Sequence, residues 1–158
     1  DSCANILKCI KGRETMSDEL LKIEKNIIDT DMYLKLRKDV GWKELTREQA
    51  TKALDNSLCT ICATLAGQPI GMGRIVGDGS VICYIQDLII HPNAQGMGVG
   101  SLLIKSLIGY VEEITPEGTE MMLDLMCAKG REDFYIQHGF IARPTDALGP
   151  GMIMYIKK

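Results

Sequence analysis

A short glycine-rich segment stands between an apolar stretch and a long amphipathic one. Gly96, Gly98 and Gly100 alternate with other residues in the loop Gln95-Gly96-Met97-Gly98-Val99-Gly100. Because glycine has no Cβ, an anion can approach the backbone N–H groups of such a loop closely. A helix that begins there adds free N–H donors and a dipole that favours negative charge. The segment therefore predicts a phosphate-binding site.

The spacing of these glycines argues against two common nucleotide-binding loops. A P-loop ends in Gly-Lys and then Ser or Thr, whereas Gly100 is followed by Ser101 and Leu102. A dinucleotide-binding loop has its third glycine three residues after the second, and those positions hold Ser101 and Leu103. On its own, a glycine triplet more often only lets a helix pack closely on a strand.

The rest of the pattern predicts the elements that position this loop. Apolar runs and alternation predict strands at 21–24, 57–66, 70–76, 81–90, 121–127, 140–143 and 152–157. Helical periodicity predicts helices at 32–40, 46–54, 103–114 and 131–138. Thr46 followed by Gln49 predicts a capping box. The order of these predicted strands and helices along the chain indicates a mixed α/β (α+β) fold, with a central sheet of about six to seven strands and helices on both faces. Residues 21–158 are expected to form one domain after an N-terminal extension or helix at 1–20.

Two motifs in this order resemble a known family. Gln95-x-x-Gly98-x-Gly100, after the stretch that ends at His91-Pro92, is similar to the pyrophosphate signature of the GCN5-related N-acetyltransferases. The segment from Phe134 to Phe140 resembles that family's Phe-Tyr-x-x-x-Gly-Phe element. The resemblance implies an N-acetyltransferase with acetyl-CoA as acyl donor and a primary amine, of a small molecule, as acceptor. The acetyl group would pass by direct attack in a ternary complex.

The resemblance also implies which residues hold acetyl-CoA. The pantetheine arm is expected to contact the main chain of Leu88, Ile89 and Ile90. The pyrophosphate is expected on the N–H groups of Gln95, Gly96, Met97, Gly98, Val99, Gly100 and Ser101. The asparagine that family members often carry before the Phe-Tyr helix is missing, because the sequence there is Ala128-Lys129-Gly130-Arg131. Lys129 or Arg131 is an alternative phosphate contact, and a solvated face is the simpler explanation of both.

Two side chains are candidates for proton transfer. Tyr135 is expected to be the general acid, because a phenol with a pKa of about 10 can protonate a leaving thiolate near neutral pH. Asp87 interrupts an apolar strand near the expected thioester, so its carboxylate is a candidate base for the amine. The alternatives are a space-filling tyrosine ring and a carboxylate that orders a neighbouring loop or pairs with an arginine. His91 is a further candidate base, but the proline after it favours a strand end.

The acceptor is expected among the first helices and the last loops. Tyr33, Trp42 and the segment 143–152 are candidates for lining its site, and a tryptophan suits an apolar or aromatic amine. Two alternatives from other classes remain open. One is a non-catalytic acetyl-CoA sensor or regulatory module, and the other is an interaction protein whose glycine loop is only structural.

Composition and charge narrow the function classes further. The formal net charge of -3 and the absence of a Lys/Arg block argue against nucleic-acid binding. No apolar run reaches the length of a membrane span. Cysteines inside apolar segments indicate a reducing cytoplasm, and Cys59 and Cys62 fall on opposite faces of one strand, so no metal site is expected. Members of the family it resembles often form dimers, which leaves a homodimer open.

Overall fold

A computed structural model describes residues 20–157 of the chain. The helices are α2 (Thr30–Asp39), α3 (Arg47–Asp55), α4 (Val99–Ile114) and α5 (Glu132–Ile136), with a 3₁₀ turn η1 (Pro92–Ala94). The strands are β1 (Leu21–Lys25), β2 (Cys59–Leu65), β3 (Gln68–Gly77), β4 (Ile82–Ile90) and β5 (Met122–Asp124). The extension or helix expected at 1–20 lies outside the described residues, apart from residue 20.

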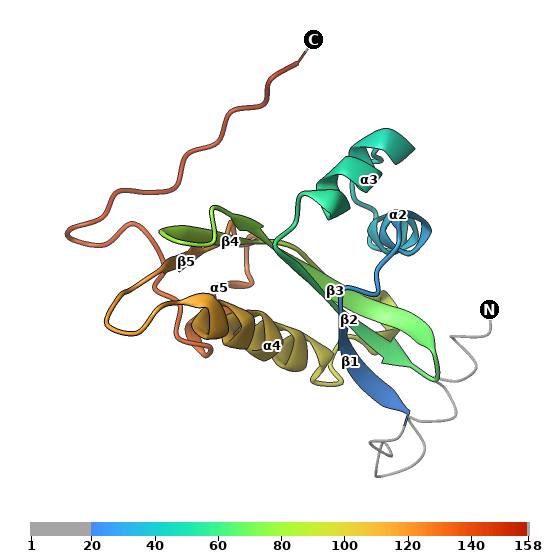
Figure 1. Ribbon diagram of the computed structural model, residues 1–158. Helices are drawn as coiled ribbons and strands as arrows, with labels where there is room; N and C mark the ends of the chain where they lie inside the picture. The colour runs from blue at the N-terminus through green and yellow to red at the C-terminus, as the bar shows by residue number, and fades with distance from the viewer. Residues whose placement is uncertain (1–19, 158) are drawn as a thin grey trace.

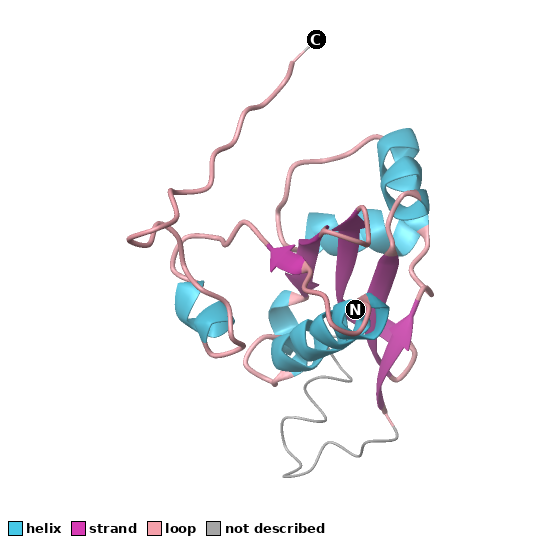
Figure 2. Cartoon of the chain, turned by 60° about the vertical axis from the view of Figure 1, so that its left-hand side comes forward, coloured by secondary structure: helices cyan, strands magenta, loops and turns pink. Residues whose placement is uncertain are grey.

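The strands form one mixed sheet in the order β1-β2-β3-β4-β5 (Figure 1). The first four are antiparallel neighbours, and β5 pairs parallel with β4. Helices α2 and α3 cover one face and α4 the other (Figure 2), each over its own buried apolar cluster. The predicted fold class is confirmed, although the sheet has five strands in the described part of the chain.

Local signals explain where the helices begin. The Asp29 side chain accepts the N–H of Met32 at the start of α2. The capping box of α3 is confirmed, since Thr46 accepts the N–H of Gln49 and Gln49 accepts that of Thr46. Helix α4 packs tightly on β3, because a Cβ at Gly73 would stand 2.6 Å from the Leu107 side chain.

The strands predicted at 140–143 and 152–157 are wrong for the described residues, where both segments are irregular. Residues 152–156 are large and apolar, yet their side chains are 65% to 88% exposed. Their pattern gives a preference for extended structure, but a strand also needs a partner. The neighbouring edge strand β5 has only three residues, and Pro144 and Pro150 supply no N–H for a ladder.

Within the described residues, no helix has the length and apolar character needed to cross a bilayer.

The cysteines of β2 are buried free thiols. Burial raises the pKa of Cys62 to about 12, so its thiol stays protonated and unreactive near neutral pH. Residues 20–157 contain no group of three or more metal-ligating side chains.

Candidate active site

The predicted phosphate loop joins β4 to α4 through the turn η1. Gly96 and Gly98 adopt left-handed backbone angles, with φ of 76° and 79°. Gly98 is the N-cap of α4, and neither a side-chain cap nor an acidic residue occupies the first turn. A Cβ at Gly96 or Gly98 would meet no protein atom within 4 Å. The loop therefore presents open space in front of free helix N–H groups, which suits a pyrophosphate.

The second motif docks directly on this loop. Helix α5 packs against the start of α4, since a Cβ at Gly100 would stand in ordinary van der Waals contact with the Phe134 ring, at 3.4 Å. His138 Nε2 lies 3.2 Å from the Ser101 hydroxyl, and its ring packs edge-on against Phe134 with centroids 5.0 Å apart. The structure therefore brings together two motifs that are more than thirty residues apart in the sequence.

Strand β4 carries a bulge just before the loop. Met72 pairs with Ile89 and Arg74 with Gln86, so two β4 residues, Asp87 and Leu88, lie opposite one residue of β3. Asp87 has a positive φ of 55°. The pairing of β4 with β5 ends at Tyr84, whereas β4 itself continues to Ile90. On the β5 side, the main chain from the bulge onward has no strand partner among the described residues.

The residues after the bulge use their side chains for packing. Leu88 and Ile90 pack on the cluster under α4, and Ile89 is buried in the cluster under α2 and α3. Their role in holding the pantetheine arm stays a prediction about main-chain atoms, and the Ile90 carbonyl already accepts a hydrogen bond from Gln95 Nε2 at 3.2 Å. His91 closes the strand, since its Nδ1 accepts the N–H of Asn93 in η1.

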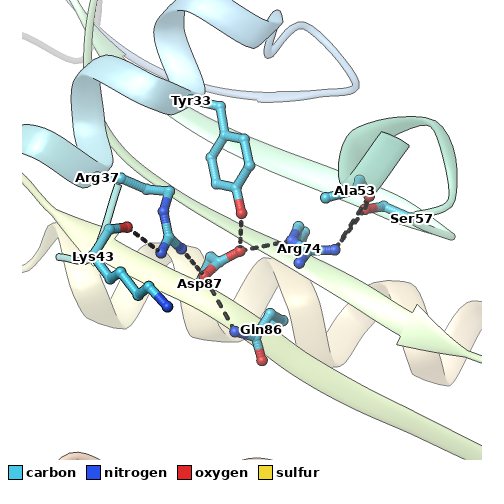
Figure 3. Close-up of polar contacts among 8 residues, drawn as sticks. All are labelled: Tyr33, Arg37, Lys43, Ala53, Ser57, Arg74, Gln86 and Asp87. Carbon is cyan, nitrogen blue, oxygen red and sulfur yellow. Dashed lines mark hydrogen bonds and ion pairs between the residues drawn. The ribbon is translucent and has the colours of Figure 1, made fainter. Parts of the chain in front are cut away.

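Asp87 is the centre of a buried polar cluster (Figure 3). The residue is 4% exposed. Its Oδ2 accepts hydrogen bonds from the Tyr33 hydroxyl and from Arg74 Nε at 2.7 Å. Its Oδ1 accepts from Arg37 Nη1 at 2.9 Å and from Gln86 Nε2 at 3.2 Å. Four donors therefore occupy a carboxylate that has about four acceptor positions.

This cluster bears on both predictions made for its members. The pairing of Asp87 with arginine matches the structural alternative, and an amine would have to displace one of its donors to reach the carboxylate. Its role as a base stays a prediction. Tyr33 is 1% exposed, so its ring is placed to support the cluster and not to line an open acceptor site.

Tyr135 lies in α5, beside the aromatic rings of the second motif. Its ring centroid is 5.1 Å from that of Phe134 and 5.9 Å from that of Phe140, both edge-on. Burial raises the pKa of Tyr135, nearby Cys127 and Tyr84 raise it further, and the charge of Arg131 opposes them. A raised pKa keeps the phenol protonated at neutral pH, the state that a proton donor requires.

A surface cavity of about 210 Å³ opens between α2 and the segment 42–45 that follows it. Trp42 is 39% exposed there, and Glu44 also lines the wall. The Arg37 guanidinium lies 5.3 Å from the centre of the Trp42 ring and also binds Asp87, so this wall is tied to the β4 bulge. The cavity thus has an aromatic wall, and its charged lining consists of Glu44 together with Arg37 and Lys38.

Sequence reasoning missed Asp124 at the end of β5. Its Oδ1 is buried and has no hydrogen-bond partner in the described part of the chain. The only sequence signal was an acidic residue within an apolar run, which by itself does not distinguish a buried carboxylate from a solvated one. Tyr84, its partner across the sheet, was also missed.

Known proteins are similar to this chain in sequence and in fold. Residues 56–142, more than half of the chain, match the acetyltransferase (GNAT) domain family. An uncharacterized N-acetyltransferase, ycf52, from Gracilaria tenuistipitata var. liui is 27% identical over 148 residues, which are 91% of this chain and 79% of the relative. A probable acetyltransferase of unknown function from methicillin-resistant Staphylococcus aureus has a TM-score of 0.75 and 31% identity, covering 88% of this chain and 100% of its own.

A further relative carries a more specific name. Serotonin N-acetyltransferase 2, a chloroplastic protein of Oryza sativa subsp. japonica, is 29% identical over 73 residues. The match covers 44% of this chain and 36% of the rice protein.

The mixed sheet, its bulged β4 and the glycine loop before α4 define an acyltransferase class of protein. The chain belongs to the GNAT acetyltransferase family, whose chemistry is acetyl transfer and whose members typically use acetyl-CoA.

Proposed function

We propose that this chain transfers the acetyl group of acetyl-CoA to a primary amine of a small molecule, by direct attack within a ternary complex. The observation that carries the proposal is the open, glycine-lined N-terminus of α4, onto which the helix bearing Tyr135 docks. Holding donor and acceptor side by side removes much of the entropic barrier to such a reaction.

The proposal gives roles to the residues of the site. The loop from Gln95 to Ser101 holds the pyrophosphate through the N–H groups that follow Gln95, whose own N–H donates to the Pro92 carbonyl. The main chain of Leu88, Ile89 and Ile90 holds the pantetheine arm. Tyr135 gives its proton to the leaving thiolate, since its raised pKa keeps the phenol neutral until then. The amine approaches from the α2 and α3 face, where the cavity beside Trp42 opens.

Aromatic ethylamines are the first acceptors to test. One relative of this chain is named a serotonin N-acetyltransferase, and the partly exposed Trp42 ring gives the cavity an aromatic wall on which an aromatic ring can pack. A panel of serotonin, other arylalkylamines, polyamines, amino acids and aminoglycosides, with free-thiol detection, would identify the acceptor class.

Donor binding is tested separately by thermal unfolding with CoA and acetyl-CoA. A ligand at 100 times its Kd adds about 2.7 kcal/mol, which should raise the Tm by roughly 5–10 °C for a chain of this size. No shift with either ligand would exclude both an enzyme and an acetyl-CoA sensor. A shift without thiol release from any amine would favour the sensor or regulatory module.

Tyr135→Phe should lower kcat by roughly 100-fold or more, in the range typical of a general acid, with little change in acetyl-CoA affinity. Tyr110→Phe is the matched control, because that hydroxyl donates to the Leu58 carbonyl at the other end of α4. Steady-state kinetics and calorimetric titration of acetyl-CoA measure the two effects. Equal kcat in the wild type and Tyr135→Phe would remove this tyrosine from the mechanism.

A further inference from the structure

Asp124 lies at the point where β4 and β5 separate. It is the last residue of β5 and the parallel register partner of Tyr84, after which the ladder ends. Leu123 packs on the cluster under α4. Because neighbouring side chains of a strand alternate, Asp124 belongs to the opposite face of the sheet, which α2 and α3 cover. Asp87, after the bulge, projects from that same face into its cluster with α2.

One of the two oxygens of the Asp124 carboxylate is buried. Its Oδ1 has no hydrogen-bond partner among the described residues, although the residue as a whole is partly exposed. Burial raises the pKa of the carboxyl, and the charge of Arg143 and its own backbone N–H oppose that rise. Asp87 shows the opposite arrangement, since four donors surround it. A buried oxygen without a hydrogen-bond partner lowers the stability of the folded protein, so stability does not explain its presence and function is the alternative explanation.

The surroundings of Asp124 connect it to the rest of the site. The Tyr84 hydroxyl accepts the N–H of Met126 at 2.9 Å, which fixes the chain just after β5. Burial raises the pKa of Tyr84, and the negative charges of Asp124 and Asp87 add to the rise. Tyr84 in turn contributes to the raised pKa of Tyr135. Arg143 is the cation that acts on Asp124, and it is exposed.

We infer that Asp124 binds the ammonium group of the acceptor and is the general base of the reaction. This inference rests on the proposed function. Asp124 takes one proton from the ammonium ion, so that the free amine attacks the thioester carbonyl, and later releases that proton to solvent. The C–S bond breaks as the C–N bond forms, and Tyr135 protonates the thiolate. The nitrogen loses its second proton to the Tyr135 phenolate, which restores the phenol.

The test uses the amine that the wild-type protein acetylates best and its β,β-difluoro analogue. Fluorine lowers the pKa of the ammonium, so a much larger fraction of the analogue than of the ordinary amine is already free amine at neutral pH and does not depend on a base for its first deprotonation. Asp124→Asn should lower kcat/KM by roughly 100-fold for the ordinary amine and by less than about 10-fold for the analogue. Asp55→Asn, an exposed carboxylate at the end of α3, should leave both values unchanged.

Thermal unfolding separates a catalytic role from a structural one. Removing an unpaired buried charge should leave the Tm of Asp124→Asn equal to or above that of the wild type. Equal losses of kcat/KM for both amines, no loss for either, or a lowered Tm that accompanies the loss would each overturn the assignment. If the wild type acetylates no amine in the panel, the proposed function itself fails, and this inference fails with it.

Discussion

Asp87→Ala should lower the free energy of unfolding by about 3–5 kcal/mol, the cost typical of breaking a buried ion pair from one side. The change leaves two guanidinium groups without their shared carboxylate, and both side chains are nearly buried, Arg37 at 13% and Arg74 at 12% exposed. It also leaves the buried Tyr33 hydroxyl without its acceptor. A loss of this size is a large part of the 5–15 kcal/mol that stabilises a typical domain.

The effect extends beyond β4 because the two arginines join several elements. Arg37 also donates to the Lys43 carbonyl after α2. Arg74 also donates to the Ala53 carbonyl and the Ser57 hydroxyl at the end of α3. The Asp87 carboxylate therefore holds α2, α3 and β3 against the bulge of β4 (Figure 3).

Equilibrium unfolding in urea measures the loss, with Asp31→Ala as the matched control. Asp31 also pairs with an arginine, Arg47, but both side chains are mostly exposed. Water and salt screen such a pair, so its removal should change the midpoint of unfolding very little. A similarly small effect of Asp87→Ala would show that the buried cluster does not hold the helices.

The parts of this protein that the sequence predicted correctly depend on local signals. The Thr46 capping box, the meander of β2 to β4 and the glycine loop before α4 each follow from residues close together in the chain. The strands predicted at 140–143 and 152–157 failed for the described residues because alternation gives a preference and not a partner. Residues 152–156 do not join the sheet, and their apolar side chains are exposed.

The polar half of the site depends on contacts between distant segments. Tyr33 and Arg37 lie 54 and 50 residues from the aspartate that they bind, so no spacing rule relates them to Asp87. The sequence left two alternatives open for Asp87, and only its partners favour the paired one. Asp124 is the converse case, because its importance comes from a missing partner, which only the packed structure can show.

Gly98→Val should weaken acetyl-CoA binding by roughly 100-fold or more. Two lost hydrogen bonds to a charged group, at about 1.5–3 kcal/mol each, correspond to a loss of that size. A Cβ at this position meets no protein atom within 4 Å, so it would project into the space that the pyrophosphate is proposed to fill. The positive φ of 79° adds backbone strain of about 1–2 kcal/mol for a residue with a side chain.

Gly118→Val is the control that distinguishes the effect of backbone strain from that of a blocked pyrophosphate site. Gly118 has a φ of 75° and likewise no atom within 4 Å of a built Cβ, but it lies after α4, away from the loop. Both variants should lose similar stability by thermal unfolding, and only Gly98→Val should lose acetyl-CoA affinity by calorimetric titration. Wild-type affinity in a folded Gly98→Val protein would exclude the helix N-terminus as the pyrophosphate site, whereas an equal loss in both variants would attribute the effect to strain.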